Sequence, residues 1–336
     1  MEERTPSGVR PGPRADLDAT NYRSHALHSD DVVWREKNCY IDVWIELLHA
    51  HALVPEAMLP FVIGIDFEED QWTFCKPSHD DLYEIYGVLV NELTVWKPLL
   101  EHALEHMNRG SFVITEAPAF WLPDTASTDY RQNHTKTSIA ITHIETTGHR
   151  MGYFHNAGHF FLSGEDFIKL FQLDAPPHPG CLPLYAETVR FGHGPSLPAD
   201  ALRVASRALW RKHLKRAPSS NPVLRFAQRF AHDLPTMREL GLPHYNEWAF
   251  ATVRQLGAAF ELAAQSLQWL GHGADAECPV AAEAFTQIAH DAKAMIFKGA
   301  RAIVLHRPLD PVAELEKTAM AWETGLQAVR QHFAGK

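Results

Sequence analysis

The period of the apolar residues changes once along this chain, and that change limits the folds available to it. Between residues 111 and 155, short runs of alternating apolar and polar residues predict β-strands, most clearly over 137–144. A passage with six prolines between positions 176 and 198 follows. Beyond it, apolar residues recur at the helical period in the stretches 199–214, 222–240, 245–270, 279–301 and 311–333. We therefore expect an α+β protein with a C-terminal helical bundle.

The proline-rich passage also predicts where the chain divides into domains. Residues 1–20 are rich in proline, glycine and charge, which is typical of a disordered lead-in. We expect one domain over 21–190 and a helical domain over 196–336. A chain of 336 residues is long enough for two such domains.

Composition excludes several classes of function. A net charge of −10 argues against binding to a nucleic-acid backbone. The four cysteines are widely spaced and form no Cys-x-x-Cys pair, which suits a reducing compartment better than a disulfide scaffold. No signal-like apolar segment or long apolar run is present, so we expect a cytoplasmic protein with no membrane span.

Cys39 stands at the start of a predicted helix that runs to about residue 53. Ile41, Trp44, Ile45 and Leu48 form its apolar face. A cysteine at a helix N-terminus lies beside unpaired N–H groups and the positive end of the helix dipole, and both favour the thiolate. Cys39 is thus a candidate nucleophile, and the alternative is a small buried core residue.

The chain continues with a predicted hairpin that offers partners for this thiol. A cysteine on a helix, followed by a histidine before a strand and an amide after the next strand, is the order of papain-like enzymes. In such sites the imidazole takes the thiol proton and the third side chain orients the imidazole. The candidates here are Cys39, His134 and Asn156, with His143 or His155 as alternative bases.

Six motifs lie along the first half of the chain: Asn38-Cys39-Tyr40, Asp70-Gln71-Trp72-Thr73-Phe74, Leu122-Pro123-Asp124-Thr125, Tyr130-Arg131, His134-Thr135-Lys136-Thr137 and Tyr153-Phe154-His155-Asn156-Ala157-Gly158. On these motifs, the chain from about residue 22 resembles a bacterial family of domains of unknown function, family 1839, whose members are often encoded near amino acid:carrier-protein ligases. The stretch 110–167, which ends with Leu162-Ser163-Gly164-Glu165-Asp166-Phe167, is more distantly similar to the N-terminal domain of butirosin-biosynthesis H proteins and to papain-like cysteine peptidases.

The butirosin-type resemblance implies a papain-like N-terminal domain that transfers acyl groups. Cys39 would attack the phosphopantetheine thioester of an aminoacyl carrier protein, and a small-molecule amine would then accept the acyl group. His134 would be the base, Asn156 would orient it, and the backbone N–H of Cys39 with Asn38 or Gln71 would hold the oxyanion. We expect no bound cofactor beyond the carrier's phosphopantetheine arm. The alternatives are a cysteine peptidase or amidase and a non-catalytic carrier-binding module.

Other polar groups are further candidates for substrate contacts or a metal site. Histidine and carboxylate side chains around the hairpin (Asp124, Asp129, His134, His143, His155 and His159) could hold a metal ion, although we expect none. Basic residues between 207 and 216 could dock an acidic carrier protein, and Glu68, Glu69 and Asp70 could bind an amine. The residues that we expect near substrate are Trp72, Asp124, Tyr130, Arg131, Lys136 and His155.

Overall fold

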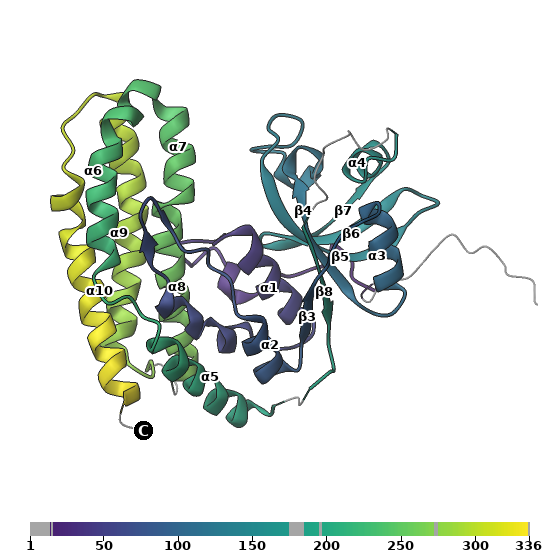
Figure 1. Cartoon of the computed structure of the whole chain (residues 1–336), viewed down its shortest axis with the longest axis horizontal. Helices are drawn as coiled ribbons and strands as arrows, with labels where there is room; N and C mark the ends of the chain where they lie inside the picture. The colour runs from purple at the N-terminus through teal and green to yellow at the C-terminus, as the bar shows by residue number, and fades with distance from the viewer. Residues whose placement is uncertain (1–13, 15, 175–184, 195–196, 272–274, 335–336) are drawn as a thin grey trace, which may run out of the picture. The chain divides into compact units, whose positions relative to one another are not determined.

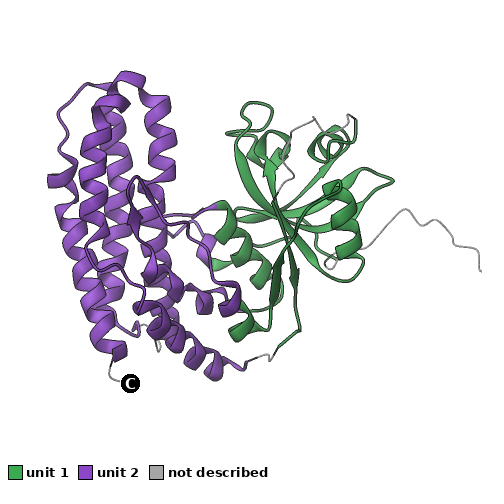
Figure 2. Cartoon of the chain, viewed as in Figure 1, with its two compact units in different colours: residues 1–26, 39–53, 82–196 green, residues 27–38, 54–81, 197–336 purple. Residues whose placement is uncertain are grey.

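The computed structural model describes residues 14, 16–174, 185–194, 197–271 and 275–334 (Figure 1). The chain forms two compact units (Figure 2). Unit 1 comprises residues 1–26, 39–53 and 82–196, and unit 2 comprises residues 27–38, 54–81 and 197–336. Unit 1 contains a six-stranded sheet and unit 2 is mostly helical, which confirms the expected α+β class. Most of the predicted lead-in, five of the six prolines of the proline-rich passage and Cys181 lie outside the described residues.

Two early segments, 27–38 and 54–81, belong to unit 2, although we assigned both to the domain over 21–190. The second contains η2 (Pro55–Gly64), a 3-10 helix that is buried over most of its length. Because η2 is apolar on all sides, it needs cover on all sides. It packs against α5 (Ala199–Leu214) and α8 (Val253–Leu270) of the same unit.

The sheet of unit 1 is antiparallel throughout, in the order β3-β8-β4-β5-β6-β7. The predicted strand over 137–144 is β5. The sequence did not predict β7, which is too apolar to show alternation, or β8, which lies in the passage that we took as a boundary. The strands are β3 (Leu89–Glu92), β4 (Phe112–Pro118), β5 (Lys136–Glu145), β6 (Arg150–His155), β7 (Gly158–Ser163) and β8 (Ala186–Arg190).

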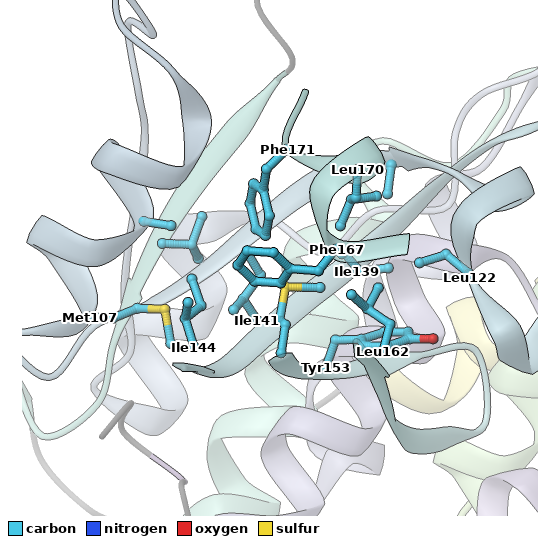
Figure 3. Close-up of a cluster of buried hydrophobic side chains, with 14 of the residues drawn as sticks. Met107, Leu122, Ile139, Ile141, Ile144, Tyr153, Leu162, Phe167, Leu170 and Phe171 are labelled. Carbon is cyan, nitrogen blue, oxygen red and sulfur yellow. The ribbon is translucent and has the colours of Figure 1, made fainter. Parts of the chain in front are cut away.

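Helices cover both faces of this sheet. α1 (Cys39–His49) packs against β5 and β6, and α3 (Leu99–Met107) and α4 (Glu165–Leu170) belong to the opposite face. On that opposite face Ile139, Ile141 and Tyr153 meet Phe167 of α4 in one hydrophobic cluster (Figure 3). Since side chains alternate along a strand, the even-numbered residues 136–142 of β5 point toward α1.

Unit 2 is a bundle around α8, most of whose side chains are buried. Gly257 of α8 allows the Trp34 indole to lie against the helix backbone, because a Cβ at position 257 would come within 2.5 Å of Trp34 Nε1. The helix predicted over 245–270 is two helices that meet at Thr252. The remaining elements are η1 (Ala26–His28), β1 (Phe67–Glu68), β2 (Gln71–Trp72), α2 (His79–Tyr86), α6 (Pro222–Leu240), α7 (Leu242–Ala251), α9 (Pro279–Val304) and α10 (Pro311–Ala334). No helix in the described part of the chain combines the length and the apolar character needed to cross a bilayer.

Candidate functional site

Cys39 is the first residue of α1, and its side chain is partly exposed. Its Sγ lies 3.6 Å from Oγ of Ser138 on β5. The helix is held firmly on the sheet because Ile41, Trp44 and Ile45 are fully buried beneath it. The N–H groups of a first helical turn point out of the helix end, so this thiol stands at the positive end of the helix dipole.

Two charged residues share the sheet face of Ser138. Glu116 of β4 is the cross-strand partner of Ser138, and Lys136 precedes Ser138 by two positions, so both point to the same side. Lys136 Nζ lies 2.5 Å from Glu116 Oε1, and the lysine is largely exposed. We call Cys39, Ser138, Glu116 and Lys136 the Cys39 site.

A buried carboxylate ties the first turn of α1 to the sheet. The Tyr40 hydroxyl donates a hydrogen bond to Glu187 Oε2 of β8 at 2.6 Å, and the Tyr185 hydroxyl donates to the other oxygen. Burial and the charge of Glu187 raise the pKa of both tyrosines above the ordinary value, so both remain donors. These hydrogen bonds fix the position of Tyr40, the residue that follows Cys39.

A second polar arrangement lies on the opposite face of the sheet. His155 Nδ1 lies 2.5 Å from Asp124 Oδ2, and its Nε2 lies 2.8 Å from Thr137 Oγ1. Tyr153 donates to the other oxygen of Asp124, which is on η4 (Pro123–Thr125). If Nδ1 donates to the carboxylate, the neutral ring accepts a hydrogen bond from the Thr137 hydroxyl. All four side chains are buried or nearly so.

The order of residues along β5 separates these two arrangements. Thr137 contacts His155 and Ser138 contacts Cys39, and consecutive residues of a strand point to opposite faces. The register of β5 shifts only between Ile141 and His143, beyond both contacts. His155 is therefore not in a position to take a proton from Cys39. Within the described residues, no ring nitrogen lies at hydrogen-bond distance from the Cys39 sulfur.

The structure does not bring His134 or Asn156 into hydrogen bonds with Cys39. His134 is exposed in the loop before β5, and its ring stacks on Phe120 of η3 (Ala119–Trp121) with centroids 4.2 Å apart. It precedes Ser138 by four residues, which is about 13 Å along an extended chain. Asn156 is in the tight turn between β6 and β7 with φ of 45°, a conformation that asparagine tolerates better than most residues. Its position is thus explained by the turn.

The other expected contact residues are distributed over both units. Asn38, Gln71 and Trp72 belong to unit 2. The Asn38 amide donates to the carbonyl oxygen of Cys75 at 3.1 Å, Gln71 is exposed on β2, and Trp72 packs against Phe67 and Phe226.

In unit 1, Tyr130 and Arg131 both bind Asp166, at 2.9 Å and 2.6 Å. His159 faces the α1 side of the sheet as the cross-strand partner of Phe154, whereas His155 faces the other side. Among the described residues, no three His, Cys, Asp or Glu side chains are grouped so that they could hold a metal ion.

Sequence reasoning missed Ser138, Glu116 and Thr137. The alternation over 137–144 was a signal for the two faces of the strand. It did not show which face a distant helix would cover, and therefore which residue would meet Cys39.

The fold and this site define an α+β protein with a partly exposed cysteine at the N-terminus of a helix packed on an antiparallel sheet. The chain belongs to the DUF1839 family: residues 23–191 match the DUF1839 N-terminal domain, and residues 199–331 match the DUF1839 C-terminal domain. This confirms the family resemblance drawn from the motifs. Comparison with curated proteins found no match.

Proposed function

We propose that this protein takes an acyl or aminoacyl group from a carrier-protein thioester onto Cys39 and passes it to an amine. One observation carries the proposal: a partly exposed thiol stands at the first residue of α1, with the Ser138 hydroxyl 3.6 Å away and no imidazole beside it among the described residues. This arrangement suits thioester exchange better than amide cleavage, for a reason that lies in the leaving group.

Amide hydrolysis needs a general acid, because an amine leaves only after it has been protonated. A thioester releases a thiol of pKa about 8.5, which leaves as the thiolate without that help. Cysteine is also a few per cent thiolate at about pH 7 and is intrinsically nucleophilic, so it can attack a thioester without a neighbouring base. The missing imidazole therefore disfavours the peptidase alternative more than it disfavours acyl transfer.

In the first step, a bond forms between the Cys39 sulfur and the acyl carbon, and the bond from that carbon to the pantetheine sulfur breaks. The proton lost by Cys39 ends on the pantetheine thiol. The Cys39 thiol donates to the Ser138 Oγ at 3.6 Å, and when the thiol is ionised the same hydroxyl can donate to the sulfur. The Cys39 N–H is available to the oxyanion in this scheme. In the second step, the amine attacks the acyl-enzyme, the new amide forms, and the Cys39 thiol takes up a proton.

Glu116 supplies a feature that fits amines in this scheme. Its carboxylate lies on the Ser138 face and is partly exposed, paired with a lysine that is largely in solvent. A surface ion pair of this kind contributes only about 0–1 kcal/mol, so an ammonium group of the substrate can replace Lys136 at low cost.

The same lack of an imidazole favours a second candidate, a carrier-binding module without catalysis. The basic residues proposed for docking are partly engaged within unit 2, since Arg207 pairs with Glu277 at 2.8 Å and Lys212 pairs with Asp81 at 2.6 Å. Docking through that patch would have to compete with these ion pairs.

The test is incubation with an aminoacyl-loaded carrier protein, followed by intact-mass measurement. We expect an acyl adduct on the wild type and on Cys278→Ala, whose cysteine is buried, but none on Cys39→Ala. Ser138→Ala should slow adduct formation by about tenfold, because the variant lacks one hydrogen bond to the sulfur. An unchanged adduct on Cys39→Ala would overturn the proposal.

Two further outcomes separate the alternatives. Carrier binding without an adduct would favour the non-catalytic module, and release of the acyl group to water at a rate independent of added amine would favour hydrolysis. Because His134 does not contact the thiol, His134→Ala should leave the pKa of Cys39, measured from its alkylation rate against pH, unchanged.

A further inference from the structure

Unit 2 contains a cavity of about 450 Å³, within the range of small-molecule sites. Its walls come from the end of η2, from the segment that leads into α2, and from the C-terminal end of α5. Every residue that lines it belongs to unit 2, so the cavity is defined without reference to the Cys39 site. The lining residues are Phe61, Gly64, Ile65, Thr73, Phe74, Lys76, Pro77, Ser78, His79, Asp80, His213 and Arg216.

The charge of this lining differs from the charge of the whole chain. Lys76 and Arg216 are cationic, His79 and His213 add imidazoles, and Asp80 is the one carboxylate among the described residues of the lining. The chain as a whole carries a net charge of −10. A cavity with a positively charged lining attracts anions even when the protein as a whole is negatively charged.

Arg216 is free to bind a ligand. Its guanidinium has no hydrogen bond or ion pair with any described residue, and the side chain is exposed. The stem of the side chain runs past Gly64, whose missing Cβ would lie 3.6 Å from Arg216 Cβ. An arginine on a cavity wall without a carboxylate partner is suited to bidentate binding of a phosphate.

The wall beside Arg216 is tied to a buried carboxylate by two hydrogen bonds. His213 Nε2 lies 2.6 Å from Oδ2 of Asp81, which is fully buried, and Lys212 Nζ lies 2.6 Å from the other oxygen. Burial raises the pKa of Asp81, but the hydrogen bonds from His213 and Lys212 outweigh it and hold that pKa below the ordinary value. The carboxylate therefore stays charged and engaged with these partners, and it does not oppose an anion in the cavity.

The remaining walls are apolar and aromatic. Phe61 is buried, while Phe74 is 57% exposed, an unusual position for so large an apolar side chain. The first turn of α2, from His79, adds backbone N–H groups at the same end as Ser78. Charge and apolar surface are thus present in one cavity.

We propose that this cavity binds a small organic phosphate, with the phosphate between Lys76 and Arg216 and the apolar part of the molecule against Phe61 and Phe74. The site is independent of the proposed chemistry at Cys39. It requires only that unit 2 is folded in the full chain.

Isothermal titration of the full-length protein with phenyl phosphate tests the site, because this probe carries one dianionic phosphate and one ring. We expect saturable binding that is tighter than binding of phenol or inorganic phosphate alone. Arg216→Gln should weaken it by about tenfold, which corresponds to one charge-assisted hydrogen-bonding group. Arg216→Lys should restore part of the loss.

The matched control is Lys215→Gln, which removes the adjacent exposed charge outside the cavity lining. It should leave the affinity unchanged, and both variants should melt at the wild-type temperature because both side chains are exposed. Equal weakening by Lys215→Gln and Arg216→Gln would show general surface attraction and overturn the proposal. Phenol binding as tightly as phenyl phosphate, or no saturable binding of phenyl phosphate, would also overturn it.

Discussion

His159 should make unit 1 sensitive to acid. It is 2% exposed on β7, its Nε2 lies 3.0 Å from Thr142 Oγ1, and its Nδ1 is buried without a partner among the described residues. Burial, followed by the nearby charges of His143 and Arg14, lowers its pKa to about 4. An imidazolium in this position would lose water and find no acceptor for its Nδ1–H among the described residues.

The magnitude follows from the difference between the folded and unfolded pKa values. An unfolded histidine titrates near 6.5, so the difference is about 2.5 units, which corresponds to at most about 3.4 kcal/mol. As the pH falls below about 6.5, the unfolded chain binds the proton first, and the free energy of unfolding decreases. The contribution of neutral His159 to the free energy of unfolding is therefore fully present above about pH 6.5 and is lost by about pH 4.

The assay compares the wild type with His159→Gln by hydrogen exchange in urea on peptides that cover β5–β7, because the two units can unfold separately. Glutamine does not titrate, so the stability difference between the two proteins should shrink by about 3 kcal/mol from about pH 7 to about pH 4. His134→Gln changes an exposed histidine of the same unit, and its stability should depend on pH in the same way as that of the wild type. If the stability difference between the wild type and His159→Gln changes by less than about 0.5 kcal/mol between about pH 7 and about pH 4, the reasoning is refuted.

Three further substitutions test the packing of the two units. Asp124→Ala should destabilise unit 1 by about 3 kcal/mol in urea unfolding, since it leaves His155 buried without its acceptor; a loss below about 1 kcal/mol would contradict this. Asn156→Gly should leave stability and any acyl transfer within about twofold of wild type, because the turn needs only the positive φ, whereas loss of transfer with intact folding would support the orienting role. Gly257→Ala should cost unit 2 about 1–3 kcal/mol by displacing the Trp34 indole, and an unchanged thermal midpoint would show that the contact is not tight.

Much of the fold could be predicted from local pattern. The helix that starts at Cys39, the strand over 137–144 and the long C-terminal helices were recognisable because their signals lie within a few turns or residues of chain. β8 was not recognisable, because its partners β3 and β4 lie far upstream and no local alternation marks it. The assignment of 54–81 to unit 2 likewise depends on helices that follow more than a hundred residues later.

The sequence by itself determined that a cysteine begins a buried helix and that histidines flank a hairpin. Only the tertiary structure decided that Ser138 meets the thiol and that His155 binds Asp124 on the other side of the sheet. The physical reason is the two-residue period of a strand: neighbours in sequence point to opposite faces, and long-range packing chooses the face that the helix covers.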